Sequence, residues 1–217
     1  AKHSPETRIR FALAELGPTF IKLGQVLSTR TNLVGVTLAR ELEHLQCESP
    51  ADPPEVVREV IETELKRPVD ELFNDFEDTP LASASIGQVH CARLKTGEEV
   101  VIKVQHRGIQ EKVRVDLDIL AGLALLAERV PEFHNYRPTA TVQEFSRTIS
   151  RELDFDRECR NMQRFAQAFR GDASVRIPTP YPSYCTQRVL TMERLVGAKL
   201  SESQKLSELE VDREKIA

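Results

Sequence analysis

The chain has 217 residues, a formal net charge of −4 and 40% hydrophobic residues, which is enough apolar material for a sizeable core. This balance argues against a disordered chain and provides no basic surface for binding nucleic acid. No apolar run approaches the roughly 20 residues of a membrane-spanning helix, and no secretory signal opens the sequence. We therefore expect a soluble, cytoplasmic protein without a nucleic-acid partner.

Cysteine and histidine spacing predicts neither disulfides nor a metal centre. The four cysteines lie far apart without a CxxC pair, and the five histidines lack HExxH spacing. We expect free thiols and no metal site within this chain. The cysteines are Cys47, Cys91, Cys159 and Cys185.

Helices are predicted throughout about the first 75 residues. Capping by Ser4 predicts a helix over 5–16, and Pro18 opens a second one after Gly17. In this second helix Lys22 and Gln25 lie on a polar stripe beside an apolar face. Leucines at 38, 42 and 45 repeat the helical spacing, and a loop over 48–54 precedes a helix that ends near residue 68.

Period-two patterning begins after residue 80 and predicts a β-hairpin. Its strands are expected at 88–94 and 99–105, joined by a turn at 95–98 that contains Gly97. A helix is then expected over 109–130, and another over 139–169 with a break near Leu153. Prolines exclude a helix from the next segment, so extended pieces are expected near 175–177 and 184–192 before a polar C-terminal helix.

Two features of the hairpin region could carry phosphate chemistry. Small residues over 82–88 allow backbone amides to approach a phosphate closely, although a tight turn between strands needs the same residues. Alternation places Val100, Ile102 and Val104 on one strand face and Lys103 on the other, as for the phosphate-binding lysine of kinases. A solvated strand lysine is the alternative. The small-residue segment consists of Ala82, Ser83, Ala84, Ser85, Ile86, Gly87 and Gln88.

A lysine of this kind needs an acidic partner on a nearby helix. Glu158 lies beside an apolar stripe on the predicted helix and is our candidate partner for Lys103. Glu144, Glu152 and Asp154 are competitors, because surface acids on helices are commonly only solvated.

Three separated motifs together resemble the UbiB family of atypical kinase-like proteins. They are LGPTFIKLGQVLSTR (16–30) with its KxGQ element, the alanine-rich PLASASIGQVH (80–90), and ELDFDREC (152–159) with an ExD element. They occur in family order and span most of the chain. One departure is Arg30-Thr31-Asn32, where the family often has Arg-Pro-Asp.

The resemblance implies roles for individual residues. Lys103 would bind ATP phosphates with Glu158 as its partner, and residues 82–88 would cover the nucleotide. Lys22 and Gln25 would form a regulatory lid facing Glu152 and Asp154. The segment at 190–197 would be the hinge to a second lobe. There Met192, Glu193 and Leu195 would contact adenine, unless Met192 is ordinary core packing.

The sequence thus predicts an α+β fold in which a helical extension (1–78) packs on a kinase-like N-lobe (79–200), followed by a linker (201–217). The catalytic loop and Mg²⁺-binding aspartate of the family are absent from these residues, so we expect them in a C-lobe outside this chain and expect the chain alone to be inactive. The resemblance implies an ATP-dependent kinase or ATPase in quinone or isoprenoid-lipid metabolism, with lipid-handling partners at the periphery of the inner membrane. A non-catalytic nucleotide-sensing module and a plain helical interaction module are the alternatives.

Overall fold

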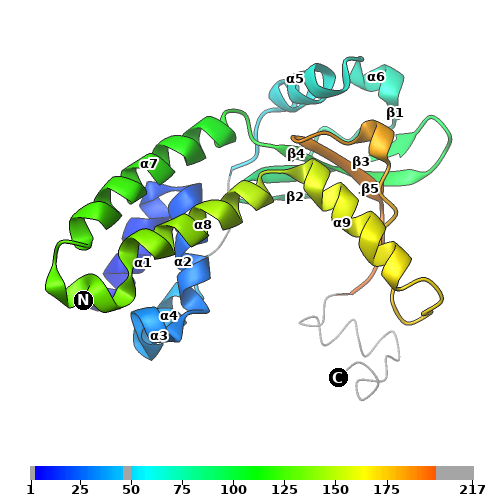
Figure 1. Cartoon of the computed structure of the whole chain (residues 1–217). Coiled ribbons are helices and arrows are strands. Elements are labelled where there is room, and N and C mark those ends of the chain that lie inside the picture. The colour runs from blue at the N-terminus through cyan, green and yellow to red at the C-terminus, as the bar shows by residue number, and fades with distance from the viewer. Residues whose placement is uncertain (1–2, 46–49, 199–217) are drawn as a thin grey trace.

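The computed structural model describes residues 3–45 and 50–198 and has the α+β fold that the sequence predicts (Figure 1). An antiparallel sheet lies beside a layer of long helices. The helices are α1 (Pro5–Leu16), α2 (Pro18–Ser28), α3 (Thr31–Val34), α4 (Val36–Leu42), α5 (Pro54–Leu65), α6 (Val69–Leu72), α7 (Ile109–Ala127), α8 (Pro138–Glu152) and α9 (Phe155–Ala168). The strands are β1 (Phe73–Asn74), β2 (Ala82–Ser83), β3 (Gly87–Leu94), β4 (Glu99–Gln105) and β5 (Val189–Glu193), and two 3-10 turns are η1 (Pro131–Tyr136) and η2 (Pro182–Tyr184).

The β3–β4 hairpin is the centre of the sheet. The strands follow the order β1-β3-β4-β5, every pairing is antiparallel, and the short β2 also pairs with β3. Both hairpin strands lie within one residue of their predicted limits because apolar and other residues alternate along them. Gly97 adopts φ +108° in the connecting turn, a conformation that favours glycine. The register places Val89 opposite Lys103.

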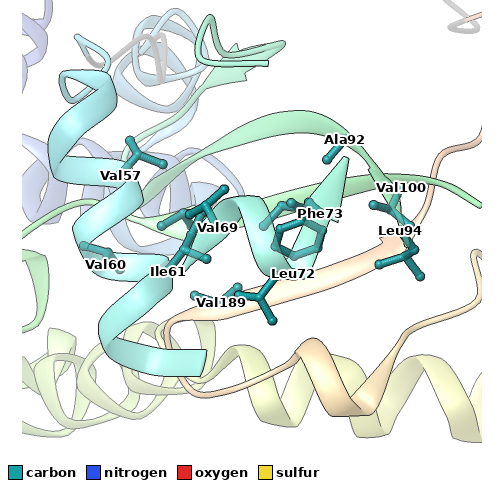
Figure 2. Packing of buried hydrophobic residues seen from close by; sticks show 12 residues of the cluster. Val57, Val60, Ile61, Val69, Leu72, Phe73, Ala92, Leu94, Val100 and Val189 are labelled. Atoms are coloured by element: carbon teal, nitrogen blue, oxygen red, sulfur yellow. The ribbon is translucent and has the colours of Figure 1, made fainter. Parts of the chain in front are cut away.

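Each face of the sheet packs against a different helix. Val100, Ile102 and Val104 join a buried cluster with Val57 and Ile61 of α5 on one face (Figure 2). On the other face, Leu190 of β5 packs against Phe155 and Cys159 of α9. This two-sided burial fixes which side of β4 carries Lys103.

The long helices α7 and α8 run side by side and pack against α2. Phe20 of α2 contributes to a core with Ile109, Phe145 and Ile149 from α7 and α8. Gly24, the glycine of the KxGQ element, allows α2 to approach Leu45, because a Cβ at this position would overlap the Leu45 side chain. The glycine is therefore explained by packing.

Several predicted boundaries differ from the structure. Phe73–Asn74 forms β1 instead of helix, because it pairs with the end of β3. The expected helix over 109–130 ends at Ala127, and the helical spacing around Leu45 ends with α4 at Leu42. No strand forms at 175–177, and only the end of the expected 184–192 segment is a strand, since just residues 189–193 reach β4. The predicted C-terminal helix lies outside the described residues, and the domain division at residue 78 remains a prediction.

The predicted break near Leu153 is confirmed: α8 ends at Glu152 and α9 begins at Phe155. Cys91, Cys159 and Cys185 are free thiols, and Cys47 lies outside the described residues. In the part of the chain that the structure describes, no helix has the combined length and apolar content needed to cross a membrane.

His90 of β3 makes the stability of the fold dependent on pH. Its ring is fully buried, and burial lowers its pKa. Its Nδ1 lies 2.8 Å from the Glu77 carbonyl, and its Nε2 lies 2.7 Å from the Gln88 amide nitrogen, which suits a neutral ring with hydrogen on Nδ1. A proton therefore binds the unfolded chain more tightly, so the free energy of unfolding falls as pH drops below the unfolded value of about 6.5.

Below about pH 6.5, we expect this residue to lower the free energy of unfolding of the wild type by up to about 1.4 kcal/mol per pH unit, as measured by urea unfolding. His90→Gln should flatten this dependence between about pH 6.5 and 5. His134→Gln, at an exposed position, is the matched control. An unchanged pH dependence in His90→Gln would contradict the assignment.

Candidate functional site

Lys103 and Glu158 meet on the face of the sheet covered by α9. Their Nζ and Oε2 atoms lie 2.8 Å apart, and the ammonium also lies 4.5 Å from the ring centroid of buried Phe155. The strand alternation and the α9 stripe place these groups where the sequence predicts them. Of the four acids considered for Lys103, the structure pairs it with Glu158. A partly buried ammonium held in this way can bind an anion while its own position stays fixed.

A hollow of about 640 Å³ opens beside this ion pair. Four cationic side chains and two carboxylates line it, so its charge balance favours an anionic ligand. The lining residues are Lys22, Ala84, Ser85, Ile86, Lys103, Thr148, Arg151, Glu152, Arg157, Glu158 and Asn161. Arg151, Arg157, Thr148 and Asn161 were missed by the sequence reasoning, although all four lie next to the ExD element or on its two helices.

The alanine-rich segment supplies one wall of the hollow through Ala84, Ser85 and Ile86. Its turn is closed by the Ala84 amide, which donates to the Gly87 carbonyl at 2.9 Å. Gln88 does not line the hollow. Its buried side chain accepts a hydrogen bond from the Asp52 amide at 2.6 Å and contacts His90. Alternation along β3 places Gln88 on the sheet face opposite to that of Lys103. Ala82 and Ser83 form β2.

Lys22 closes one side of the hollow by pairing with Glu152. Its Nζ lies 2.9 Å from Oε1 of Glu152, so α2 is joined to the end of α8. Asp154 instead caps α9, accepting the Arg157 amide at 3.0 Å. The two acids of the ExD element therefore have different roles, an ion pair and a helix cap, because α8 ends at the first and α9 begins after the second. Gln25 donates from its amide to the Leu45 carbonyl at 3.3 Å.

The break between α8 and α9 is attached to the sheet by Gln105. This buried side chain donates to the carbonyl of Leu153 at 2.5 Å and to that of Gln187 at 2.9 Å. The Phe155 amide also donates to the Gln187 carbonyl, at 3.1 Å. Glu152 and Glu158 are consequently held on either side of a fixed point at the end of β4. Sequence reasoning missed this role, although alternation placed Gln105 on the same strand face as Lys103.

We expect the Lys22–Glu152 pair to make a modest contribution to stability. The two side chains are 24% and 33% exposed, so solvent screens the attraction, and a double-mutant cycle of Lys22→Met and Glu152→Gln should give about 0.3–1 kcal/mol of coupling. The Arg30–Glu144 pair, exposed by 47% and 65%, is the matched control and should give less. Urea unfolding measures both cycles. Equal coupling energies would contradict the expectation that the less exposed pair contributes more to stability.

The predicted hinge residues lie at the end of β5 and do not line the hollow. Met192 packs against the Phe155 and Cys159 cluster beneath Lys103. The Glu193 amide donates to the Thr179 carbonyl at 2.8 Å, so only its carbonyl is left for another contact. A hydrogen bond from Arg176 lowers the pKa of the Glu193 carboxyl. Leu195 is exposed.

The cluster under Lys103 is apolar. Cys185, like Met192, packs against it, and burial raises the pKa of the Cys185 thiol to about 12. Within residues 3–45 and 50–198, no group of three or more histidine, cysteine, aspartate or glutamate side chains could hold a metal ion. The described site therefore offers cations and amides to a ligand, without a metal cage.

Comparisons with known proteins point to one family. The ABC1 atypical kinase-like domain matches residues 44–217. A protein of Pseudomonas aeruginosa named "Probable protein kinase UbiB" is 41% identical over 97% of this chain and 40% of its own length. The protein of that name from Aeromonas hydrophila is 42% identical over 90% of this chain and 36% of its own.

A Synechocystis protein, sll1770, described as uncharacterized, is 39% identical over 96% of this chain and 36% of its own length. Among solved structures, the complex of Rv3197 with erythromycin from Mycobacterium tuberculosis gives a TM-score of 0.61 at 31% identity. That match covers 70% of this chain and 38% of Rv3197. The chain spans about two fifths of the length of the curated relatives that it matches.

Proposed function

The chain belongs to the ABC1 atypical kinase-like family, and from this premise we propose that it is the nucleotide-binding part of a UbiB-type atypical kinase or ATPase. The observation that carries the proposal is the hollow around Lys103, where four cations face two carboxylates. A polyphosphate is the anionic ligand that suits a lysine held by a helix carboxylate beside a loop of small residues.

In this proposal Lys103 contacts the phosphates of ATP, and Glu158 holds the lysine in place. Ala84, Ser85 and Ile86 cover the nucleotide with their backbone. Met192, the Glu193 carbonyl and Leu195 border the adenine, at the end of the sheet where the chain leaves β5. The bound ATP would supply the phosphoryl group for transfer or hydrolysis.

Among the described residues, no group of three or more histidine, cysteine, aspartate or glutamate side chains forms a complete metal cage, so Mg²⁺ bound with ATP would need further ligands. We propose that its ligands and the catalytic base lie in a second lobe, and that this chain alone binds ATP without turning it over. A non-catalytic nucleotide sensor is the second candidate, since the same hollow would bind a nucleotide without turning it over. Measuring ATP hydrolysis by the full-length protein separates the two, since a sensor would show none.

We also propose that α2 acts as a lid over the hollow. The support is the Lys22–Glu152 contact, which joins α2 to the end of α8 at the edge of the hollow. A lid in this place would restrict access by a macromolecular substrate while leaving room for a nucleotide. For the whole protein, we propose a role in ubiquinone biosynthesis, with a lipid or quinone-precursor substrate and membrane-associated partners at the periphery of the inner membrane. The likeness to proteins named "Probable protein kinase UbiB" supports the first part of this proposal.

Thermal unfolding with and without millimolar MgATP or MgADP tests the proposal. A ligand present at 100 times its Kd stabilises the native state by about 2.7 kcal/mol, which corresponds to roughly 5–10 °C for a chain of this size. We expect such a rise with ATP and with ADP, and a smaller one with adenosine. The proposal is wrong if neither nucleotide raises the melting temperature of this chain or of the full-length protein.

A further inference from the structure

His106 holds the alanine-rich segment without lining the hollow. It follows the last residue of β4 and is 9% exposed. Its Nε2 lies 2.8 Å from the Ala84 carbonyl oxygen, and its backbone amide donates to the Ile86 carbonyl at 3.1 Å. One residue therefore holds two carbonyl groups of the segment that lines the hollow.

The contacts of the imidazole define its hydrogen positions. A carbonyl oxygen only accepts, so Nε2 must carry the hydrogen donated to Ala84. On the other side of the ring, Nδ1 lies 3.2 Å from Oδ2 of Asp52, within ion-pair distance but outside hydrogen-bond geometry. The same Asp52 oxygen accepts the Arg107 amide at 3.0 Å, and the Asp52 amide is held by Gln88. The hydrogen bond from Nε2 thus fixes one side of the ring, and the Asp52 carboxylate lies beside the other.

The orientation of the Ala84 carbonyl has a consequence for the next amide. In a trans peptide the C=O and N–H groups point in opposite directions, and none of the peptide bonds in the described residues is cis. Directing the Ala84 carbonyl to His106 therefore directs the Ser85 amide away from His106. His106 does not line the hollow around Lys103, whereas Ala84, Ser85 and Ile86 do.

We propose that His106 is a positioning residue that, through Nε2–H and the Ala84 carbonyl, fixes the alanine-rich segment in the orientation that receives the phosphates of a nucleotide. This inference rests on the proposed nucleotide binding and adds to it the residue that sets the segment. His106 acts through Ala84 and does not itself touch the ligand. Its loss should weaken recognition of phosphates more than recognition of the nucleoside.

The matched variants are His106→Gln and His106→Asn. A glutamine amide reaches about as far as Nε2 and can keep the donor to Ala84, whereas asparagine is one methylene too short. Affinities for ATP and for adenosine are measured by competition with a fluorescent ATP analogue, on the same wild-type and variant chains. We expect the Asn variant to bind ATP about five- to tenfold more weakly, as for one lost hydrogen bond, with its adenosine affinity unchanged. The Gln variant should recover most of the ATP affinity.

Equal weakening of ATP and adenosine in the Asn variant would overturn the inference, because it would indicate general loosening. Unchanged ATP affinity would overturn it as well. The wild type is measured first. If it binds neither ligand, or binds adenosine as tightly as ATP, the proposed function itself is wrong, and this is known before any variant is compared. If the Asn variant melts below the assay temperature, the affinities of the wild type and both variants are measured at a lower temperature at which all three are folded.

Discussion

Replacing Lys103 by methionine is expected to abolish the stabilisation that MgATP gives to the wild-type chain. Methionine keeps an apolar stem over Phe155 but removes the ammonium that lies 2.8 Å from Glu158. A phosphate would then face Glu158 without the intervening cation, so attraction becomes repulsion. The melting-temperature rise of roughly 5–10 °C at 100 times Kd should fall to nearly zero.

Two controls make this result specific. Lys95→Met removes an exposed lysine from the turn of the same hairpin, where it contacts Asn74, and should leave the nucleotide response intact. Lys103→Met combined with Glu158→Gln removes the unpaired carboxylate and should recover stability without recovering the response. A full nucleotide response in Lys103→Met would place the phosphates elsewhere.

Gly87→Ala is expected to be the most destabilising small substitution in the hairpin. A Cβ at Gly87 would overlap the Val104 carbonyl oxygen and lie 3.1 Å from Cα of Gln105. Both are backbone atoms of β4, so relief requires the strands to separate. We expect a loss of about 2–3 kcal/mol in the free energy of unfolding, as for overpacking of a core.

Gly122→Ala is a control that should change the free energy of unfolding in the opposite direction. Gly122 is exposed in α7, and a Cβ there would meet nothing within 4 Å. Alanine should stabilise the helix by up to about 1 kcal/mol. Urea unfolding distinguishes the two variants, and a similar effect of both would show that the close approach of β3 and β4 does not matter.

Local patterning was sufficient to predict the features with short-range causes. Alternation fixed the limits of the β3–β4 hairpin and the face of Lys103, and helical spacing placed Glu158 beside the buried stripe of α9. It also indicated a break near Leu153, although Gln105, which holds that break, lies 48 residues away in the sequence. Patterning alone could not choose among four acids for Lys103.

Features that depend on distant partners escaped prediction. Strands β1 and β2 are each two residues long and form by pairing with β3. Two residues are too few to show the alternation that predicts a strand. The contact of His106 with Ala84 joins the end of one strand to the turn before another. Asp154 resembles its neighbour Glu152 in charge, yet it caps α9 because it falls where a new helix begins. These assignments require the tertiary arrangement.

The junction held by Gln105 connects two helices that each carry one carboxylate of the hollow. The first is α8, whose last residue Glu152 is attached to α2 through Lys22, and the second is α9, which carries Glu158. Both hydrogens of the Gln105 side-chain amide are committed at this junction, to the carbonyls of Leu153 and Gln187. The helix that borders the hollow and the ion pair inside it therefore share one attachment to the sheet, so loss of the Gln105 side chain would loosen both together.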